Sequence, residues 1–120
     1  MLQDINSKKE FSSILKENSS QSDSNNLIVL DFFDDCTHCS EMNHKLNEIS
    51  EKYDSISLLS KDRDIKFYKV NIEDDKSLAN EYSISSIPTT LFFKKGKLID
   101  KVVGPEPNEI KQVIEDNDLI

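Results

Sequence analysis

Two cysteines separated by two residues are the chemically distinctive feature of this chain. Cys36 and Cys39 are its only cysteines, and they stand in the sequence C-T-H-C. Such a pair suits disulfide exchange, in which one thiolate attacks a disulfide and the second thiol resolves the mixed disulfide. It also suits metal binding, with His38 and His44 as the nearby nitrogen ligands, although zinc usually takes four ligands. The spacing by itself leaves both interpretations open.

The residues around the cysteines predict a strand followed directly by a helix. Leu27–Phe33 is apolar without alternation, as expected for a central strand covered on both faces. After the turn Asp34-Asp35, apolar residues recur at helical spacing, at Met42, Leu46, Ile49 and Tyr53. The cysteines therefore fall at a helix start, where free amides and the helix dipole favour a thiolate. We expect Cys36 to attack and Cys39 to resolve.

Four further strands and three further helices are predicted along the chain. The strands are Leu2–Ile5, Ile65–Ile72, Thr89–Phe93 and Lys97–Val103, and the helices begin near Ser7, Glu73 and Pro107. Ser19–Asn26 is a polar loop, Asp54–Asp64 is an extended helix end or a loop, and Lys95-Gly96 is a hairpin turn. The order β-α-β-α-β-α-β-β-α predicts an α/β fold with a mixed central sheet flanked by helices.

Length and charge narrow the function classes. The 120 residues predict one domain, 1–120, with a net charge of −8 that argues against nucleic acid as a partner. No stretch approaches the roughly 20 apolar residues of a membrane span. The first residues lack the apolar core of a secretory signal, so we expect a cytoplasmic protein. A close cysteine pair in a reducing cytosol is more often catalytic or metal-binding than structural.

Six segments, in order, resemble the thioredoxin family across residues 27–104. They are V-L-D-F-F, C-T-H-C, F-Y-K-V-N-I-E, Y-S-I-S-S-I-P-T-T, F-F-K-K-G-K and V-V-G. The resemblance implies the thioredoxin fold and a thiol–disulfide oxidoreductase that exchanges its cysteine pair with disulfides in proteins. Because Ile87-Pro88-Thr89 lies downstream of the cysteine motif, the resemblance favours redox chemistry over a metal site.

The same resemblance implies a substrate-binding surface around a proline loop. Pro88 would be a cis-proline beside the disulfide, the backbone of Ile87 would pair with an extended substrate, and Gly104 would leave room for it. No metal or organic cofactor is expected. Electrons would come from a thioredoxin-reductase-type enzyme or from small thiols, and the protein would be a monomer.

The resemblance also assigns a buried carboxylate to the site. Asp31 would lie beneath the cysteines, with Lys69 near it. Burial raises the pKa of a carboxyl group, so Asp31 would be suited to take the proton of Cys39 as it attacks.

Two departures from the family pattern bear on the direction of the reaction. Thr37-His38 replaces the usual Gly-Pro, and a histidine there resembles disulfide isomerases and oxidants, so we expect a pair less reducing than in typical thioredoxins. The usual tryptophan is absent, and Asp34-Asp35 stands there in a loop one residue shorter. A carboxylate beside Cys36 opposes its thiolate, whereas His38 favours it. An isomerase-like or oxidant-like enzyme and a non-catalytic adaptor are the alternatives.

Overall fold

The computed structural model describes residues 2–20, 26–57 and 65–118. Its elements are β1 (Leu2–Asp4), α1 (Lys8–Ser20), β2 (Leu27–Phe33), α2 (Thr37–Ser57), β3 (Ile65–Asn71), α3 (Lys76–Glu81), β4 (Thr89–Lys94), β5 (Lys97–Val103) and α4 (Pro107–Asp118). The predicted order of strands and helices is confirmed.

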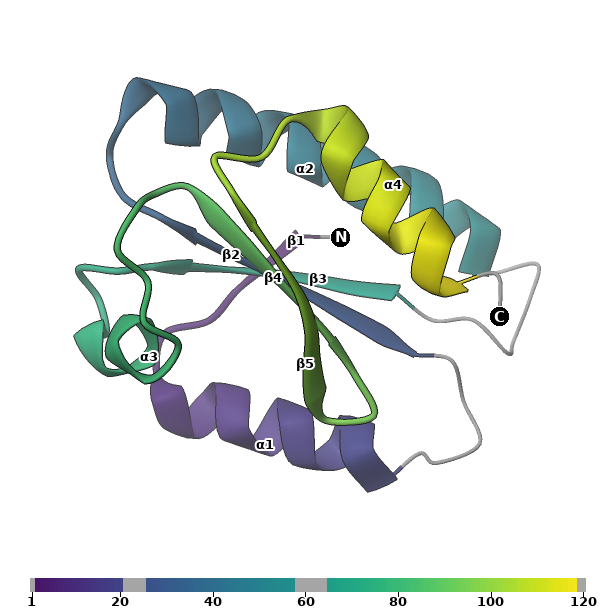
Figure 1. Cartoon of the computed structure of the whole chain (residues 1–120), viewed down its shortest axis with the longest axis horizontal. Helices are drawn as coiled ribbons and strands as arrows, with labels where there is room; N and C mark the ends of the chain where they lie inside the picture. Colours follow the sequence, from purple (N-terminus) through teal and green to yellow (C-terminus); the bar gives the residue numbers. More distant parts are fainter. Residues whose placement is uncertain (1, 21–25, 58–64, 119–120) are drawn as a thin grey trace.

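A mixed five-stranded sheet forms the centre of the molecule, in the order β1-β3-β2-β4-β5. The first three strands are parallel, whereas β4 runs antiparallel to β2 and β5 antiparallel to β4. Figure 1 shows α2 and α4 on one face of the sheet and α1 and α3 on the other. β2 therefore ends, and α2 begins, at the end of the sheet where the parallel strands have their carboxyl termini.

Alternate side chains of β2 enter two separate cores. Ile28, Leu30 and Phe32 pack in the core on the α1 side, and Leu27 and Val29 in the core under α2 and α4. All five are at most 2% exposed. Full burial of such a side chain contributes about 1.5–3 kcal/mol, so both faces of β2 must be apolar. This explains why the run lacks alternation.

Aromatic side chains fill the core on the α1 side. Phe11 of α1 meets Phe93 edge to face at 5.2 Å between ring centroids, and Tyr82 meets Phe93 at 5.5 Å. Edge-to-face geometry is favourable because the positive ring edge meets the negative ring face. These contacts fix α1 and the end of α3 to the sheet.

Element boundaries differ from the predictions by a few residues. α1 continues to Ser20, two residues into the predicted loop Ser19–Asn26, whose residues 21–25 lie outside the described part. The helical interpretation of Asp54–Asp64 is confirmed through Ser57, and residues 58–64 are likewise outside it. β3 stops at Asn71 because its side chain accepts a hydrogen bond from the amide of Glu73 at 2.9 Å and begins a turn.

The hairpin between β4 and β5 turns where the sequence predicts it. Lys95 and Gly96 both have positive φ, 55° and 77°. The amide of Gly96 donates to Oδ1 of Asn18 at 2.7 Å, which joins the hairpin tip to α1. A Cβ added to Gly96 would lie 2.6 Å from Cβ of Ser19, so this close approach requires glycine.

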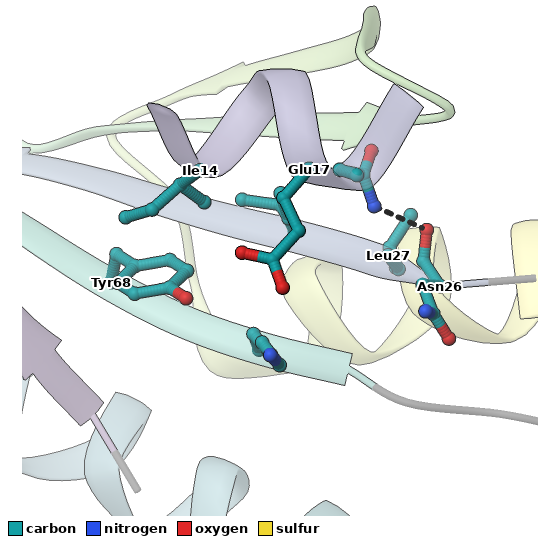
Figure 2. A pocket seen from close by; sticks show the side chains of 8 residues that line it. Ile14, Glu17, Asn26, Leu27 and Tyr68 are labelled. Carbon is teal, nitrogen blue, oxygen red and sulfur yellow. Dashed lines mark hydrogen bonds between the residues drawn. The ribbon is translucent and has the colours of Figure 1, made fainter. Parts of the chain in front are cut away.

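A small cleft lies between α1 and the amino-terminal ends of β2 and β3 (Figure 2). Its volume is about 40 Å³, and its lining includes Ile14, Glu17 and Tyr68. Nδ2 of Asn18 closes one side by donating to the carbonyl of Asn26 at 3.4 Å. The cleft has room for about one water molecule. It lies at the opposite end of β2 from the cysteines and takes no part in their site.

Across the described ranges, none of the helices is long and apolar enough to cross a bilayer.

Candidate active site

The two cysteines form a disulfide where β2 leads into α2. Cys36 precedes the first residue of α2, Cys39 lies in its first turn, and their Cα atoms are 5.1 Å apart. Cys36 is partly exposed, whereas Cys39 is fully buried at 0%. Only Cys36 therefore presents a surface that another molecule can reach.

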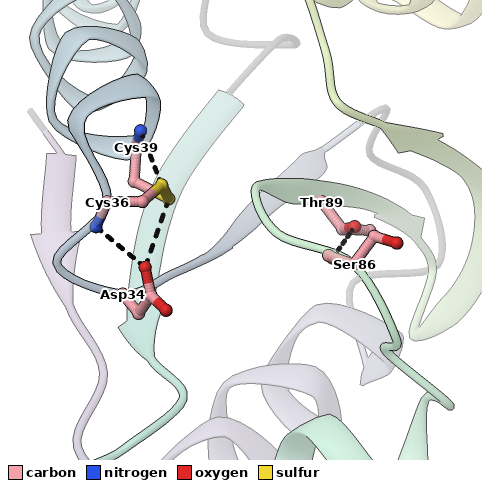
Figure 3. The surroundings of a disulfide bond; sticks show 5 residues. All are labelled: Asp34, Cys36, Cys39, Ser86 and Thr89. Atoms are coloured by element: carbon pink, nitrogen blue, oxygen red, sulfur yellow. Dashed lines mark hydrogen bonds between the residues drawn. A yellow bond between two sulfur atoms is a disulfide. The ribbon is translucent and has the colours of Figure 1, made fainter.

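Asp34 contacts both cysteines (Figure 3). Its Oδ1 accepts a hydrogen bond from the amide of Cys36 at 2.8 Å and lies 3.7 Å from Sγ of Cys39. Sγ of Cys36 in turn accepts from the amide of Cys39 at 3.0 Å. A disulfide sulfur carries no proton, so the contact between Asp34 and Cys39 becomes a hydrogen bond only when Cys39 is a thiol. The two sulfur atoms thus have different neighbours, an N–H donor for one and a carboxylate for the other.

Asp31 lies in the sheet face that α2 covers and is fully buried. Its Oδ1 accepts a hydrogen bond from the hydroxyl of Thr90 at 3.1 Å, and its Oδ2 is buried without a partner among the residues that the structure describes. Burial raises the pKa of Asp31 to about 7, against the smaller opposing effects of the Thr90 hydrogen bond and the charge of Lys69. The predicted burial of this carboxylate is confirmed, and it can exchange a proton near neutral pH.

Lys69 stands opposite Asp31 in the pairing of β2 with β3. Its ammonium group lies 3.6 Å from the carboxylate of Asp4 and 5.4 Å from the ring centroid of Phe33. The lysine is therefore anchored at the edge of the site, and its charge lowers the pKa of Asp31 from there.

The proline loop leads from α3 into β4 and lies beside the end of β5. The peptide bond between Ile87 and Pro88 is cis, and the carbonyl of Pro88 accepts a hydrogen bond from the amide of Gly104 at 2.8 Å. The Thr89 hydroxyl donates to the carbonyl of Ser86, and Figure 3 shows both residues in the surroundings of the disulfide. The structure thus brings the three predicted substrate-binding residues together.

The histidines lie on the surface. His38 is exposed at the start of α2. His44 is exposed as well and pairs with Glu48, with 3.2 Å between Nε2 and Oε1. The group that comes closest to a metal-ligand arrangement consists of Asp34 and the two cysteines, with ligand atoms within 4.8 Å of one another. Both sulfur atoms are joined in the disulfide, and neither is a thiolate ligand in this state.

Sequence reasoning missed two contacts of the site. Thr90 is the hydrogen-bond donor to Asp31, and no sequence signal marks it, because the pairing register of β2 and β4 puts it there. Asp34 was expected as a helix-cap or turn residue and as a carboxylate that opposes the Cys36 thiolate, but not as a contact of Cys39. Its position two residues before Cys36 does signal an Asx-type contact with that amide, but its approach to Cys39 depends on the path of the turn.

A redox-active cysteine pair at a strand-to-helix junction, on a mixed sheet covered by helices, defines a thiol–disulfide oxidoreductase. The thioredoxin family model matches residues 4–116. This chain therefore belongs to the thioredoxin family, and it is an enzyme of thiol–disulfide exchange, as the resemblance implies.

Curated relatives and solved structures agree. Thioredoxin H-type from Ricinus communis is 34% identical over 93 residues, which are 77% of this chain and 71% of that protein. Thioredoxin-2 from Saccharomyces cerevisiae is 34% identical over 92 residues, 76% of this chain and 80% of that protein. The crystal structure of reduced Schistosoma mansoni thioredoxin pre-protein superposes with a TM-score of 0.79 at 28% identity, covering 96% of each chain. The predicted thioredoxin fold is confirmed.

Proposed function

We propose that the chain works as a single domain that exchanges its cysteine pair with disulfides in proteins, with Cys36 as the attacking residue and Cys39 as the resolving residue. The difference in exposure carries this assignment. Cys36 is partly exposed, whereas Cys39 is 0% exposed and can react only with its neighbour. The amide of Cys39, which donates to Sγ of Cys36, supports it because an N–H donor favours the anionic sulfur.

The substrate would bind along the proline loop. Ile87 is partly exposed and Gly104 is exposed, so an extended segment can approach both residues from solvent. Val103, beside Gly104, is 56% exposed and offers an apolar contact in a protein without tryptophan. Pro88 would fix the geometry of this surface.

Asp31 would serve the exchange as a buried acid–base group, with Lys69 tuning it by charge. We place the reaction in the cytoplasm and expect a monomer that needs no metal or organic cofactor. A thioredoxin-reductase-type enzyme or a small thiol would return electrons to the pair. These partners follow from the family membership and from the redox character of the pair.

Selective alkylation tests the assignment. Reduced protein is treated with limiting iodoacetamide at neutral pH, and the labelled cysteine is located by mass spectrometry of peptides. We expect Cys36 to be modified first and much faster than a free thiol in an unfolded control. Equal labelling of Cys36 and Cys39, or slow labelling of both, would contradict the assignment and favour the adaptor alternative.

A second candidate function is disulfide isomerisation or oxidation. The observation that favours it is the exposed His38 between the two cysteines of the motif, where a histidine can stabilise the thiolate, and hence the reduced form of the pair, by charge or by a hydrogen bond. A stabilised reduced form makes a stronger oxidant. A measurement of the redox potential distinguishes a reductant of protein disulfides from an oxidant or isomerase.

A further inference from the structure

The site holds two carboxyl groups, and the one that contacts the reacting sulfur atoms is not the buried one. Oδ1 of Asp34 lies 3.7 Å from Sγ of Cys39. Asp31 uses its Oδ1 to accept from Thr90, and within the described ranges its Oδ2 has no hydrogen-bond partner. Asp34 is therefore the better placed of the two to receive a proton directly from Cys39.

The position of Asp34 is fixed independently of the disulfide. Its Oδ1 accepts the amide hydrogen of Cys36 at 2.8 Å, which is an Asx-type contact across two residues. This bond involves the backbone, so it does not depend on the oxidation state of the sulfur atoms. In the reduced protein the same oxygen would still be held toward Cys39.

The hydrogen bonds around the two sulfur atoms determine which cysteine keeps its proton in the reduced pair. The amide of Cys39 points at Sγ of Cys36 and favours a thiolate there, whereas the carboxylate of Asp34 faces Sγ of Cys39 and favours a protonated thiol. The acidic turn and the helix start therefore act on different sulfur atoms. The carboxylate of Asp34 acts on Cys39, and the backbone amide acts on Cys36. One becomes the nucleophile and the other keeps its proton until it attacks.

We propose that Asp34 is a catalytic base that accepts the proton of Cys39 in the resolving step. The proposal rests on the assignment of Cys36 as the attacking residue. In the first step, the Cys36 thiolate attacks the substrate disulfide, a bond forms between Cys36 and one substrate sulfur, and the other leaves as a thiolate. In the second, the proton of Cys39 passes to Asp34, and the Cys39 thiolate attacks Sγ of Cys36. The bond to the substrate breaks, and the second substrate thiolate leaves.

The proton on Asp34 has a direct route to solvent. An open pocket of about 390 Å³ is lined by Asp34 and Cys36 and reaches the side chains of Asp35 and Lys69. Water in this pocket can take the proton, and the departing substrate thiolate can be protonated there. Asp31 is fully buried and lacks such access.

Single-turnover kinetics with a chromogenic disulfide separate the two steps. Reduced protein is mixed with limiting dithiobis-nitrobenzoate, whose thiolate product absorbs visible light. The first release reports attack by Cys36 and depends on protein concentration, and the second reports attack by Cys39 and does not. Asp34→Asn keeps an oxygen for the Cys36 amide but cannot take a proton. We expect it to slow the second release about tenfold or more and to leave the first unchanged or faster.

Asp35→Asn is the matched control, because it removes the same charge from the adjacent exposed residue. Within the described part of the chain, the carboxylate of Asp35 is not in the group that Asp34 forms with the two sulfur atoms. We expect its second release to keep the wild-type rate. Asp34→Ser also retains an acceptor for the Cys36 amide and should slow the second release equally. It replaces Asp34→Asn in the test if circular dichroism shows that Asp34→Asn does not fold.

Two results would overturn the proposal: a second release within twofold of wild type in both Asp34 variants, or an equal slowing in Asp35→Asn. Failure of the underlying assignment looks different. Cys39→Ser must abolish the second release that is independent of protein concentration, because only attack by a second protein molecule then remains. Persistence of a concentration-independent second release in Cys39→Ser would refute the resolving role of Cys39 whatever Asp34 does.

Discussion

The hydroxyl of Thr90 in β4 donates a hydrogen bond of 3.1 Å to Oδ1 of Asp31 in β2, and both residues are fully buried. This single donor does not compensate for burial, and the pKa of Asp31 rises from 3.8 to about 7. A carboxyl whose pKa is raised by folding stabilises the native state while it is protonated. The contribution is fully present below pH 4 and is lost as the pH rises through 7.

We therefore expect Asp31→Asn to flatten the pH dependence of stability. A rise of about three pKa units corresponds to roughly 4 kcal/mol, so the variant should exceed wild type by up to that amount at pH 8 and by little at pH 4. Urea unfolding at both pH values measures this. Asp74→Asn, at an exposed carboxyl, should follow the wild-type curve. Parallel curves for wild type and Asp31→Asn would show that Asp31 does not titrate in this range.

Cys39→Ser should trap the covalent complex with substrate. Removing the buried resolving thiol leaves the bond between Cys36 and the substrate intact, so a mixed disulfide accumulates. Non-reducing electrophoresis after incubation with a disulfide-bonded protein detects it, and reductant should release it. Cys36→Ser serves as the control and should give no adduct, since Cys39 is 0% exposed. An adduct with Cys36→Ser but not with Cys39→Ser would reverse the two roles.

The redox potential of the pair should lie above the roughly −270 mV of thioredoxin. His38 at the start of α2 is the reason, because a histidine next to the attacking cysteine in the motif can stabilise the thiolate, and hence the reduced form, by charge or by a hydrogen bond. His38→Pro, which the first helical turn tolerates, should lower the potential by roughly 30 mV or more, equivalent to about 1.4 kcal/mol. Equilibration with glutathione buffers gives both values. His44→Gln, a change at the other exposed histidine, should leave the potential in place, and a wild-type value at or below that of thioredoxin would refute the expectation.

Gly96→Ala should destabilise the protein more than Gly104→Ala. Both glycines have positive φ, 77° and 59°, so alanine is strained at either position by about 1 kcal/mol. At Gly96 the new Cβ would also lie 2.6 Å from Cβ of Ser19, whereas nothing lies within 4 Å at Gly104. Overpacking adds about 1–3 kcal/mol. The difference between the two free energies of unfolding isolates this clash, and equal values would mean that α1 moves freely away from the hairpin.

Local patterns were sufficient for the elements that carry the site. The unbroken apolar run of Leu27–Phe33 predicts a strand buried on both faces, and its one carboxylate, Asp31, is buried as expected. The helix from Thr37 follows from the spacing of its apolar residues, and the hairpin at Lys95-Gly96 from its turn residues. Each of these predictions depends on residues that are close together in the sequence, so the sequence alone is sufficient to make it.

Contacts between distant segments were beyond such patterns. Thr90 reaches Asp31 because β4 pairs with β2 in one register, and a shift of one residue would turn it to the other face. The amide of Gly104 reaches the carbonyl of Pro88 only across the completed β4–β5 pair. Asn18 caps the hairpin tip across 78 residues of sequence.

The sequence by itself determined that this protein has a cysteine pair at a helix start and the order of its strands and helices along the chain. Residue type, periodicity and spacing specify these features locally. Only the tertiary structure decided how the two cysteines differ. It buries Cys39, leaves Cys36 reachable, and folds the turn so that the carboxylate of Asp34 faces one sulfur while a backbone amide faces the other. Burial and hydrogen-bond direction are properties of atoms placed in space, and they give each thiol its part in the exchange.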